Sequence, residues 1–185
     1  MRTTRRQLLV ATAALTIAAG MACAQDISKF VISDAAAKKT LIKNEINAET
    51  ARKIIDKCID IATKANMPIT IFILSPTGQI VASHRMDGQV PINIETALLK
   101  AQSVLVTRDS THLRANMIAN NMPQQLKWHA VGVFTTSGGL PIIAGGQMIG
   151  TIGIGGGSKD EEMAFEALEA VVGPQPPLAP TQPAR

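Results

Sequence analysis

His84, Arg85 and Asp87 lie within four positions of one another, where a predicted strand gives way to a loop. An imidazole can bind iron in an axial position, and a guanidinium pairs well with a carboxylate. The cluster therefore fits a small acidic ligand, or a cofactor whose metal is held by His84 and whose carboxylate pairs with Arg85. The same residues also fit a solvated strand end with an Arg–Asp ion pair, so their types and spacing leave both interpretations open.

The other residues that could do chemistry give weaker signals. His112 and His129 lie in polar segments, where exposure is the expected state, and the three histidines lack the spacing of a zinc site. Ser137 is followed by two glycines but lacks the strand–turn–helix context of a nucleophile elbow. Residue types alone therefore do not predict an enzyme.

Glycines concentrate in residues 138–157, and they invite comparison with phosphate-binding loops. Gly145 and Gly146 fit the turn of a hairpin, because glycine takes positive φ at little steric cost. The glycines at 155–157 precede a predicted helix, whose first N–H groups could hold an anion. However, Asp160 and two glutamates follow at once and would repel phosphate, and a dinucleotide fingerprint needs a parallel strand–helix–strand unit. We therefore interpret these glycines as structural.

The hydrophobic pattern predicts an α+β fold, in which hairpins form an antiparallel sheet and helices pack on it. Asn47 and Asn93 are the predicted N-caps of the first two helices. In chain order the predicted elements are a helix (47–65), two strands (69–74, 79–85), a helix (93–105), a short helix (110–120), three strands (130–135, 140–144, 147–154) and a helix (160–171).

Both ends of the chain differ from this central domain. Arg5 and Arg6 precede a short apolar stretch and the sequence Ala-Cys-Ala, which is typical of an export signal and too short to span a bilayer comfortably. The arginine pair favours a twin-arginine signal, with an ordinary secretory signal as the alternative. We predict a periplasmic or secreted protein with an export signal (1–24), an N-terminal extension (25–46), a folded domain (47–172) and a proline-rich flexible tail (173–185).

Removal of the signal changes the charge and the cysteine content. It takes away three of the 18 basic residues and none of the 14 acidic ones, which leaves a net charge of +1. The basic pI therefore gives no reason to expect a nucleic-acid partner. Cys58 remains alone, so no internal disulfide can form, and its place on the apolar face of the first helix predicts a packing role.

Several sequence blocks, taken in order, resemble the GlcG/HbpS family, to which the C-terminal domain of PduO-type proteins also belongs. The blocks are Arg-Met-Asp-Gly (85–88), Lys-Ala (100–101), Gly-Gly-Leu-Pro-Ile (138–142), Gly-Thr-Ile-Gly-Ile (150–154) and Gly-Gly (156–157). The resemblance covers about residues 47–171. It implies a profilin-like α/β/α sandwich with a five-stranded antiparallel sheet, assembly into a homo-oligomer, and haem as a cofactor of some exported members.

The strand-end cluster and the resemblance together predict a set of cofactor-binding residues: His84, Arg85, Asp87, Lys100 and Thr111. His84 would be the axial ligand of the haem iron and Arg85 would pair with a propionate. Thr111 stands where some members of the family have a threonine near the haem. Lys100 belongs to the Lys-Ala block that resembles the family and offers a second positive charge to an acidic ligand.

We therefore predict an exported haem- or small-cofactor-binding protein, acting as an accessory carrier or as a redox- or iron-linked sensor component. A sensor or membrane protein is the expected partner. The alternative is an accessory enzyme or oxidoreductase component acting on a small hydroxy acid or a corrinoid-type substrate, with Arg85 and Lys100 gripping a carboxylate. A third interpretation is a structural oligomer that binds only a protein partner.

Overall fold

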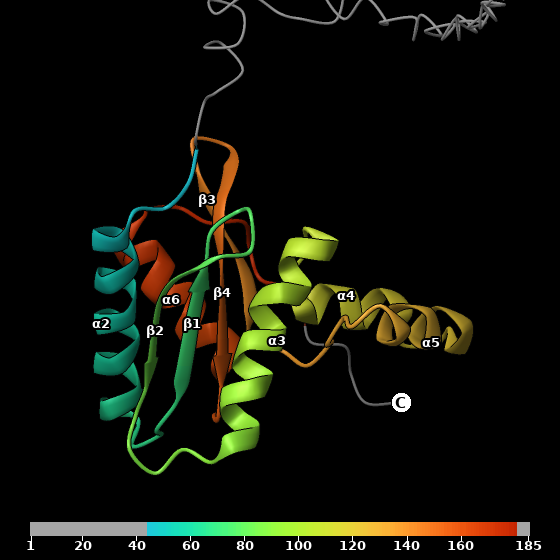
Figure 1. Cartoon of the computed structure of the whole chain (residues 1–185), viewed down its shortest axis with the longest axis horizontal. Coiled ribbons are helices and arrows are strands. Elements are labelled where there is room, and N and C mark those ends of the chain that lie inside the picture. The colour runs from blue at the N-terminus through green and yellow to red at the C-terminus, as the bar shows by residue number, and fades with distance from the viewer. Residues whose placement is uncertain (1–43, 181–185) are drawn as a thin grey trace, which may run out of the picture. The chain divides into compact units, whose positions relative to one another are not determined.

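The computed structural model describes residues 44–180. The predicted export signal, nearly all of the N-terminal extension and the last five residues of the tail lie outside this range. Figure 1 shows the elements, which follow one another as α2 (Ala48–Lys64), β1 (Thr70–Leu74), β2 (Ile80–Arg85), α3 (Pro91–Thr107), α4 (Thr111–Ile118), α5 (Met122–Ala130), β3 (Gly139–Ala144), β4 (Gln147–Gly155) and α6 (Asp160–Val171).

The strands form one antiparallel sheet in the order β2-β1-β4-β3, so β2 and β3 are its edges. Helices α2 and α6 pack together on one face, and α3 packs across β4 and β1 on the other (Figure 1). This confirms the predicted α+β class and the layered arrangement of helices around an antiparallel sheet. Both predicted hairpins are present, and Gly145 and Gly146 form the β3–β4 turn with φ values of 57° and 74°.

The prediction of a fifth strand is wrong: in the part of the chain that the structure describes, the sheet has four strands. The expected strand at 130–135 is the end of α5 followed by a turn and an irregular segment. Gly132 has a φ of 81° and donates its N–H to the carbonyl of His129 at 3.0 Å, which reverses the chain. An alternation of apolar residues this short cannot become a strand when a left-handed residue interrupts it.

The predicted helix starts have different outcomes. Asn47 is the N-cap of α2, and its side chain accepts a hydrogen bond from the Thr50 N–H at 2.8 Å. Asn93 is not the cap of α3, because Pro91 already begins that helix after Val90. Proline suits this position because its fixed φ matches the helix. An N–H group at the first helical position would have no acceptor within the helix, so proline loses no hydrogen bond there.

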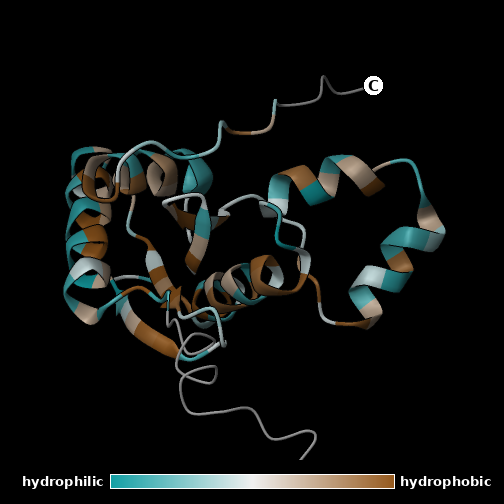
Figure 2. Cartoon of the chain, turned by 90° about the horizontal axis from the view of Figure 1, so that it is seen from above, coloured by the Kyte–Doolittle hydropathy of each residue, from teal (hydrophilic) through white to brown (hydrophobic). Residues whose placement is uncertain are grey.

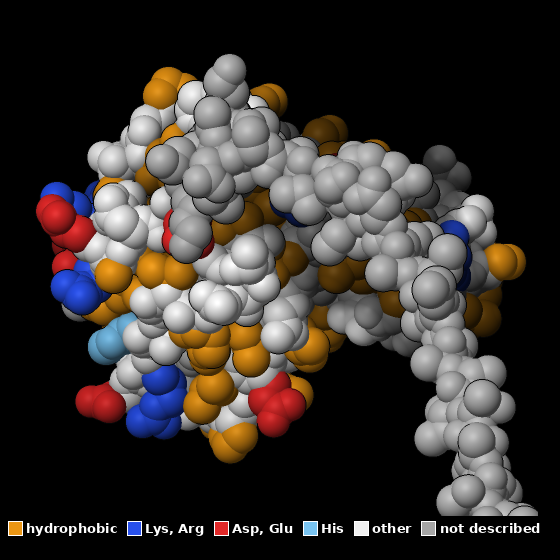
Figure 3. Space-filling model, turned by 45° about the horizontal axis from the view of Figure 1, so that its top comes forward, with side chains coloured by type: hydrophobic (Ala, Val, Ile, Leu, Met, Phe, Trp, Pro, Cys, Tyr) orange, Lys and Arg blue, Asp and Glu red, His pale blue; other side chains and the backbone are white. Residues whose placement is uncertain are grey.

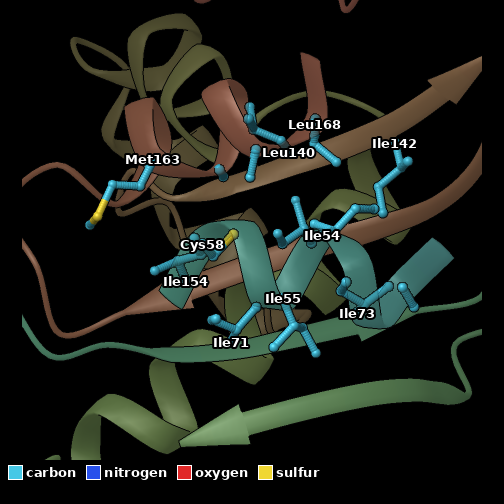
Figure 4. Close-up of a cluster of buried hydrophobic side chains, with 14 of the residues drawn as sticks. Ile54, Ile55, Cys58, Ile71, Ile73, Leu140, Ile142, Ile154, Met163 and Leu168 are labelled. Atoms are coloured by element: carbon cyan, nitrogen blue, oxygen red, sulfur yellow. The ribbon is translucent and has the colours of Figure 1, made fainter. Parts of the chain in front are cut away.

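The main core lies between the sheet and the pair α2–α6 and is almost entirely aliphatic. Ile54 and Cys58 of α2 are fully buried against Ile71 and Ile154 of the sheet (Figure 4). Burial raises the pKa of the Cys58 thiol to about 12. A thiol in this state is a poor nucleophile, so Cys58 has the packing role predicted for it.

The opposite face brings α3 unusually close to β4, and glycine makes this possible. A Cβ at Gly153 would lie 2.1 Å from the Ala97 carbonyl oxygen and 2.6 Å from the Ala101 nitrogen. The helix backbone therefore rests directly on the strand, as glycine inside a strand predicts. This close packing fixes the position of the α3 side chains that point toward the sheet's end, Lys100 among them.

Helices α4 and α5 project from the sandwich (Figures 1 and 2). The sequence predicts α4 but not α5, whose start at Asn121 followed by Pro123 is a helix signal. No residue of α5 is buried. Among residues 44–180, no helix has the length and apolarity needed to cross a bilayer.

Candidate functional site

A buried ion pair joins α3 to α6. The Lys100 ammonium donates to the Asp160 carboxylate at 2.7 Å and to the Ile154 carbonyl at 2.7 Å. Lys100 is 3% exposed and Asp160 is 5% exposed. Burial raises the pKa of Asp160 above its usual value, and the hydrogen bond from Lys100 acts in the opposite direction. The desolvation of this carboxyl group thus outweighs the attraction of its partner.

Asp160 also fixes the glycine-rich loop between β4 and α6. Its second carboxylate oxygen accepts a hydrogen bond from the Gly157 N–H at 2.8 Å. An N–H group that could have bound a phosphate is therefore already used by the protein, and the carboxylate places negative charge at the helix start. At Gly157 this agrees with the structural interpretation of the glycine-rich segment.

The ion pair lies at the side of an open polar cleft of about 440 Å³ between α3 and the loop that follows β4. Besides Lys100 and Asp160, the residues lining this polar cleft are mostly small or polar: Asn93, Thr96, Phe134, Thr136, Ser137, Gly156, Gly157 and Ser158. Two of the three donors of Lys100 are used inside the protein, so this lysine mainly links α3, β4 and α6.

Thr111 and Lys100 lie near each other at the start of β3. The Thr111 hydroxyl accepts a hydrogen bond from the Gly139 N–H at 3.0 Å. A Cβ at Gly139 would touch both residues, at 2.6 Å from a Thr111 methyl carbon and 2.8 Å from the Lys100 carbonyl. Thr111 is 1% exposed, so its visible role is to join the start of α4 to the sheet.

The other predicted residues lie elsewhere, and the structure does not group them with Lys100 and Thr111. His84, Arg85 and Asp87 are exposed at the end of the edge strand β2 and in the loop after it. His84 pairs with Ile71 and Arg85 with Thr70, so their side chains leave opposite faces of the sheet. None of the three lines either the polar cleft or the apolar cavity described next.

A second cavity, of about 450 Å³, was not foreseen from the sequence. We call it the apolar cavity. It lies between α4, β3, α6 and the first part of the proline-rich tail, and its surface is mainly hydrophobic. Its lining residues are Arg108, Asp109, Ser110, Leu113, Leu140, Pro141, Ile143, Phe165, Leu168 and Gln175 to Pro180.

The polar groups of the apolar cavity are few. Arg108 is the C-cap of α3 and has a left-handed φ of 62°. Its side chain is exposed, and its guanidinium lies 3.7 Å from the Met148 sulfur. Ser110 caps α4 by accepting from the Leu113 N–H at 3.0 Å. A concave apolar surface with a small number of polar groups at its margin is the usual form of a site for a small molecule or cofactor.

A small polar cavity of about 50 Å³ adjoins the apolar cavity and shares Leu178 and Ala179 with it. It is lined by His112 and by the carboxylate of Glu161, which is 3% exposed. One Glu161 oxygen accepts from the Ser137 hydroxyl, and the other has no hydrogen-bond partner among the described residues. His112 therefore lines a cavity next to the apolar cavity and is not one of the apolar cavity's own lining residues.

The fold resembles several solved structures. The structure of Klebsiella pneumoniae ORFY matches with a TM-score of 0.64 and 24% identity, covering 70% of this chain and 92% of that one. The structure of a PduOC–haem complex matches with a TM-score of 0.63 and 24% identity, covering 69% and 95%. The structure of HbpS matches with a TM-score of 0.62 and 25% identity, covering 70% and 91%.

Sequence comparison agrees with these structural matches. An uncharacterized 15.0 kDa protein from the dhaT–dhaS intergenic region of Citrobacter freundii is 25% identical over 130 residues, which cover 67% of this chain and 90% of that protein. The model of the family described as "haem degrading protein HbpS-like" matches residues 46–169. This match runs from the start of α2 to near the end of α6, and the chain therefore belongs to the HbpS-like family.

Proposed function

We propose that this chain is an exported haem-binding protein and that the haem lies in the apolar cavity. The observation that carries this proposal is the cavity itself. A volume of about 450 Å³ lined by Leu113, Leu140, Phe165 and Leu168 is of the size and character that hold cofactors in proteins. Family membership and the haem complex of the similar PduOC structure support haem as the ligand.

The residues around the apolar cavity fit the parts of a haem. The hydrophobic side chains would cover the faces of the macrocycle and exclude water. Arg108 at the margin would pair with a propionate, since a guanidinium binds a carboxylate with two parallel hydrogen bonds. His112 lines the adjoining small cavity and would become the protein's ligand for the iron once its Nε2 leaves the Pro180 carbonyl. Bound haem supplies iron for redox or ligand-binding chemistry, and the chain's contribution is to bind and shelter it.

The sequence predicts His84 as the ligand of the haem iron, and this prediction places the haem at a different site. A haem held by His84 and Arg85 would lie at the exposed β2 edge, where the two side chains leave opposite faces of the sheet. Arg85 there donates to the Gln89 carbonyl at 3.2 Å. The apolar cavity offers more hydrophobic surface, so we place the haem there and keep His84 as the competing ligand to be tested.

The proposed function includes export, assembly and an accessory role. The Arg5-Arg6 signal would take the protein to the periplasm or outside the cell, where it would act as a haem carrier or as a component of a sensor. Exposed hydrophobic side chains support assembly into a homo-oligomer or contact with a membrane-protein partner (Figure 3). Cell fractionation of the full chain and light scattering on residues 25–185 test these two points.

The enzymatic alternative would use the polar cleft, and the geometry favours it less. Asp160 balances the charge of Lys100, and Arg85 does not line the cleft that Lys100 lines. The two cations expected to grip one substrate carboxylate are therefore not arranged around one cavity. We propose binding of haem as the function and no turnover in the polar cleft.

Replacing Leu113 by arginine is expected to weaken haem binding at least about tenfold, because a charge placed in an apolar cavity loses its hydration. Haem titration followed in the Soret band measures the effect. Gln102→Arg is the control, since Gln102 is a polar, exposed residue of α3 and lines neither cavity. Equal affinity of both variants and the unchanged protein, with all three folded by circular dichroism, would contradict haem binding in the apolar cavity.

A further inference from the structure

We propose that residues Gln175–Pro180 form a lid over the apolar cavity and that Gln175 is the latch that holds this lid closed. The lid would control how fast a ligand enters and leaves. This inference rests on the proposed function, since the ligand in question is the haem of the apolar cavity. The lid residues all line that cavity, which makes them one of its walls.

The latch consists of two hydrogen bonds to a sheet edge. The Ile143 N–H donates to Gln175 Oε1 at 3.0 Å, and Gln175 Nε2 donates to the Ile143 carbonyl at 3.0 Å. Because β3 is an edge strand, these two groups of Ile143 point away from β4 toward the tail. The side-chain amide of Gln175 therefore takes the place that a neighbouring strand would occupy, and one residue ties the tail to the sheet.

A second set of contacts holds the far end of the lid. The Pro180 carbonyl accepts from Asn116 Nδ2 at 3.1 Å and lies 3.4 Å from His112 Nε2. Between the two ends, Leu178 is partly buried against the hydrophobic core. The lid thus spans from β3 to α4 across the cavity, and part of the segment for which we predict flexibility has fixed contacts.

The composition of the lid makes opening and closing easy. Three of its six residues, Pro176, Pro177 and Pro180, have no N–H and cannot form a strand ladder with β3. Opening therefore breaks only a few side-chain contacts. Proline also restricts the open chain, so reclosing costs less conformational entropy than for a flexible segment. These properties favour a segment that opens as a unit while the sandwich stays folded.

The test compares three forms of residues 25–185: the unchanged chain, Gln175→Ala, and Gln102→Ala as a control on the exposed face of α3. Stopped-flow mixing with haem gives the association and dissociation rates, and the dye 8-anilinonaphthalene-1-sulfonate serves as an apolar probe without iron. With two hydrogen bonds lost, we expect Gln175→Ala to raise both rates about tenfold for either probe. Gln102→Ala should match the unchanged chain.

The outcomes distinguish a failure of the lid proposal from a failure of the haem-binding proposal. Faster dye entry in Gln175→Ala without saturable haem binding in any form would support the lid and overturn the proposed function. Saturable haem binding with equal rates in all three forms would overturn the lid and leave haem binding intact. Hydrogen exchange at the Ile143 N–H gives a ligand-free check: it should be faster in Gln175→Ala, and unchanged exchange would contradict the latch.

Discussion

Replacing Lys100 by methionine is expected to lower the free energy of unfolding by about 3–5 kcal/mol, since removal of one partner leaves a buried charge without compensation. Asp160 would then be a carboxyl group at 5% exposure with only the Gly157 N–H as a donor. Urea unfolding followed by circular dichroism measures the loss. Lys53→Met is the control: Lys53 pairs with Glu49 at 2.8 Å on the surface, where solvent screens the attraction and such pairs contribute little to stability.

The loss of stability caused by Lys100→Met should grow as the pH rises. Burial already raises the pKa of Asp160 above its ordinary value of 3.8, and removal of Lys100 strengthens this effect. An acid whose pKa is higher in the folded state binds a proton more readily there, so stability falls as pH rises through the window above 3.8. Lys100→Met should therefore be most harmful at neutral pH and least harmful near pH 4. Adding Asp160→Asn to Lys100→Met should recover part of the lost free energy of unfolding. If Lys100→Met loses no more stability than Lys53→Met, the stabilising role of the buried Lys100–Asp160 pair is contradicted.

Replacing Gly153 by alanine is expected to cost about 3 kcal/mol or more, at the upper end of what overpacking causes. The added Cβ would meet the backbone of α3 at 2.1 Å and 2.6 Å, and backbone atoms cannot move aside as a flexible side chain can. The helix would have to lift from β4 and would carry Lys100 with it. Soluble yield and the midpoint of urea unfolding measure the effect.

The control for this prediction is Gly145→Ala in the β3–β4 turn. Its Cβ would meet no atom within 4 Å, so only the positive φ of 57° makes the substitution unfavourable. We expect a loss of about 1–2 kcal/mol from that conformation alone. Similar losses at Gly145 and Gly153 would show that α3 does not rest on β4 as closely as described.

Much of the fold follows from local pattern in the sequence. The stripe of α2, the apolar run of β1 and the Gly145-Gly146 turn each carry their own signal, and the helix predicted at 160–171 agrees with α6. The error at 130–135 arises because Val131 and Val133 alternate as in a strand, while Gly132 turns the chain back. Asn121 and Pro123 are the local signal for the start of α5, a helix that the apolar pattern does not predict.

The candidate site is harder to predict, because it depends on contacts between distant segments. Lys100 and Asp160 meet 60 positions apart, and nothing in the local sequence of either shows that they form a pair. Leu113, Phe165 and Leu178 each look like ordinary core residues, and only the packing of α4, α6 and the tail leaves a cavity between them. His84, Arg85 and Asp87 lie within four positions of the sequence, yet the alternation of side chains along β2 puts the first two on opposite faces of the sheet.

The most direct test of haem binding in the apolar cavity is a Soret titration of residues 25–185 with His112→Ala and His84→Ala in parallel. We predict a saturable, stoichiometric band that persists in His84→Ala and that shifts or collapses in His112→Ala. A band lost only in His84→Ala would move the haem to the β2 edge and contradict the placement in the cavity. The absence of a saturable band in all three proteins would contradict haem binding itself.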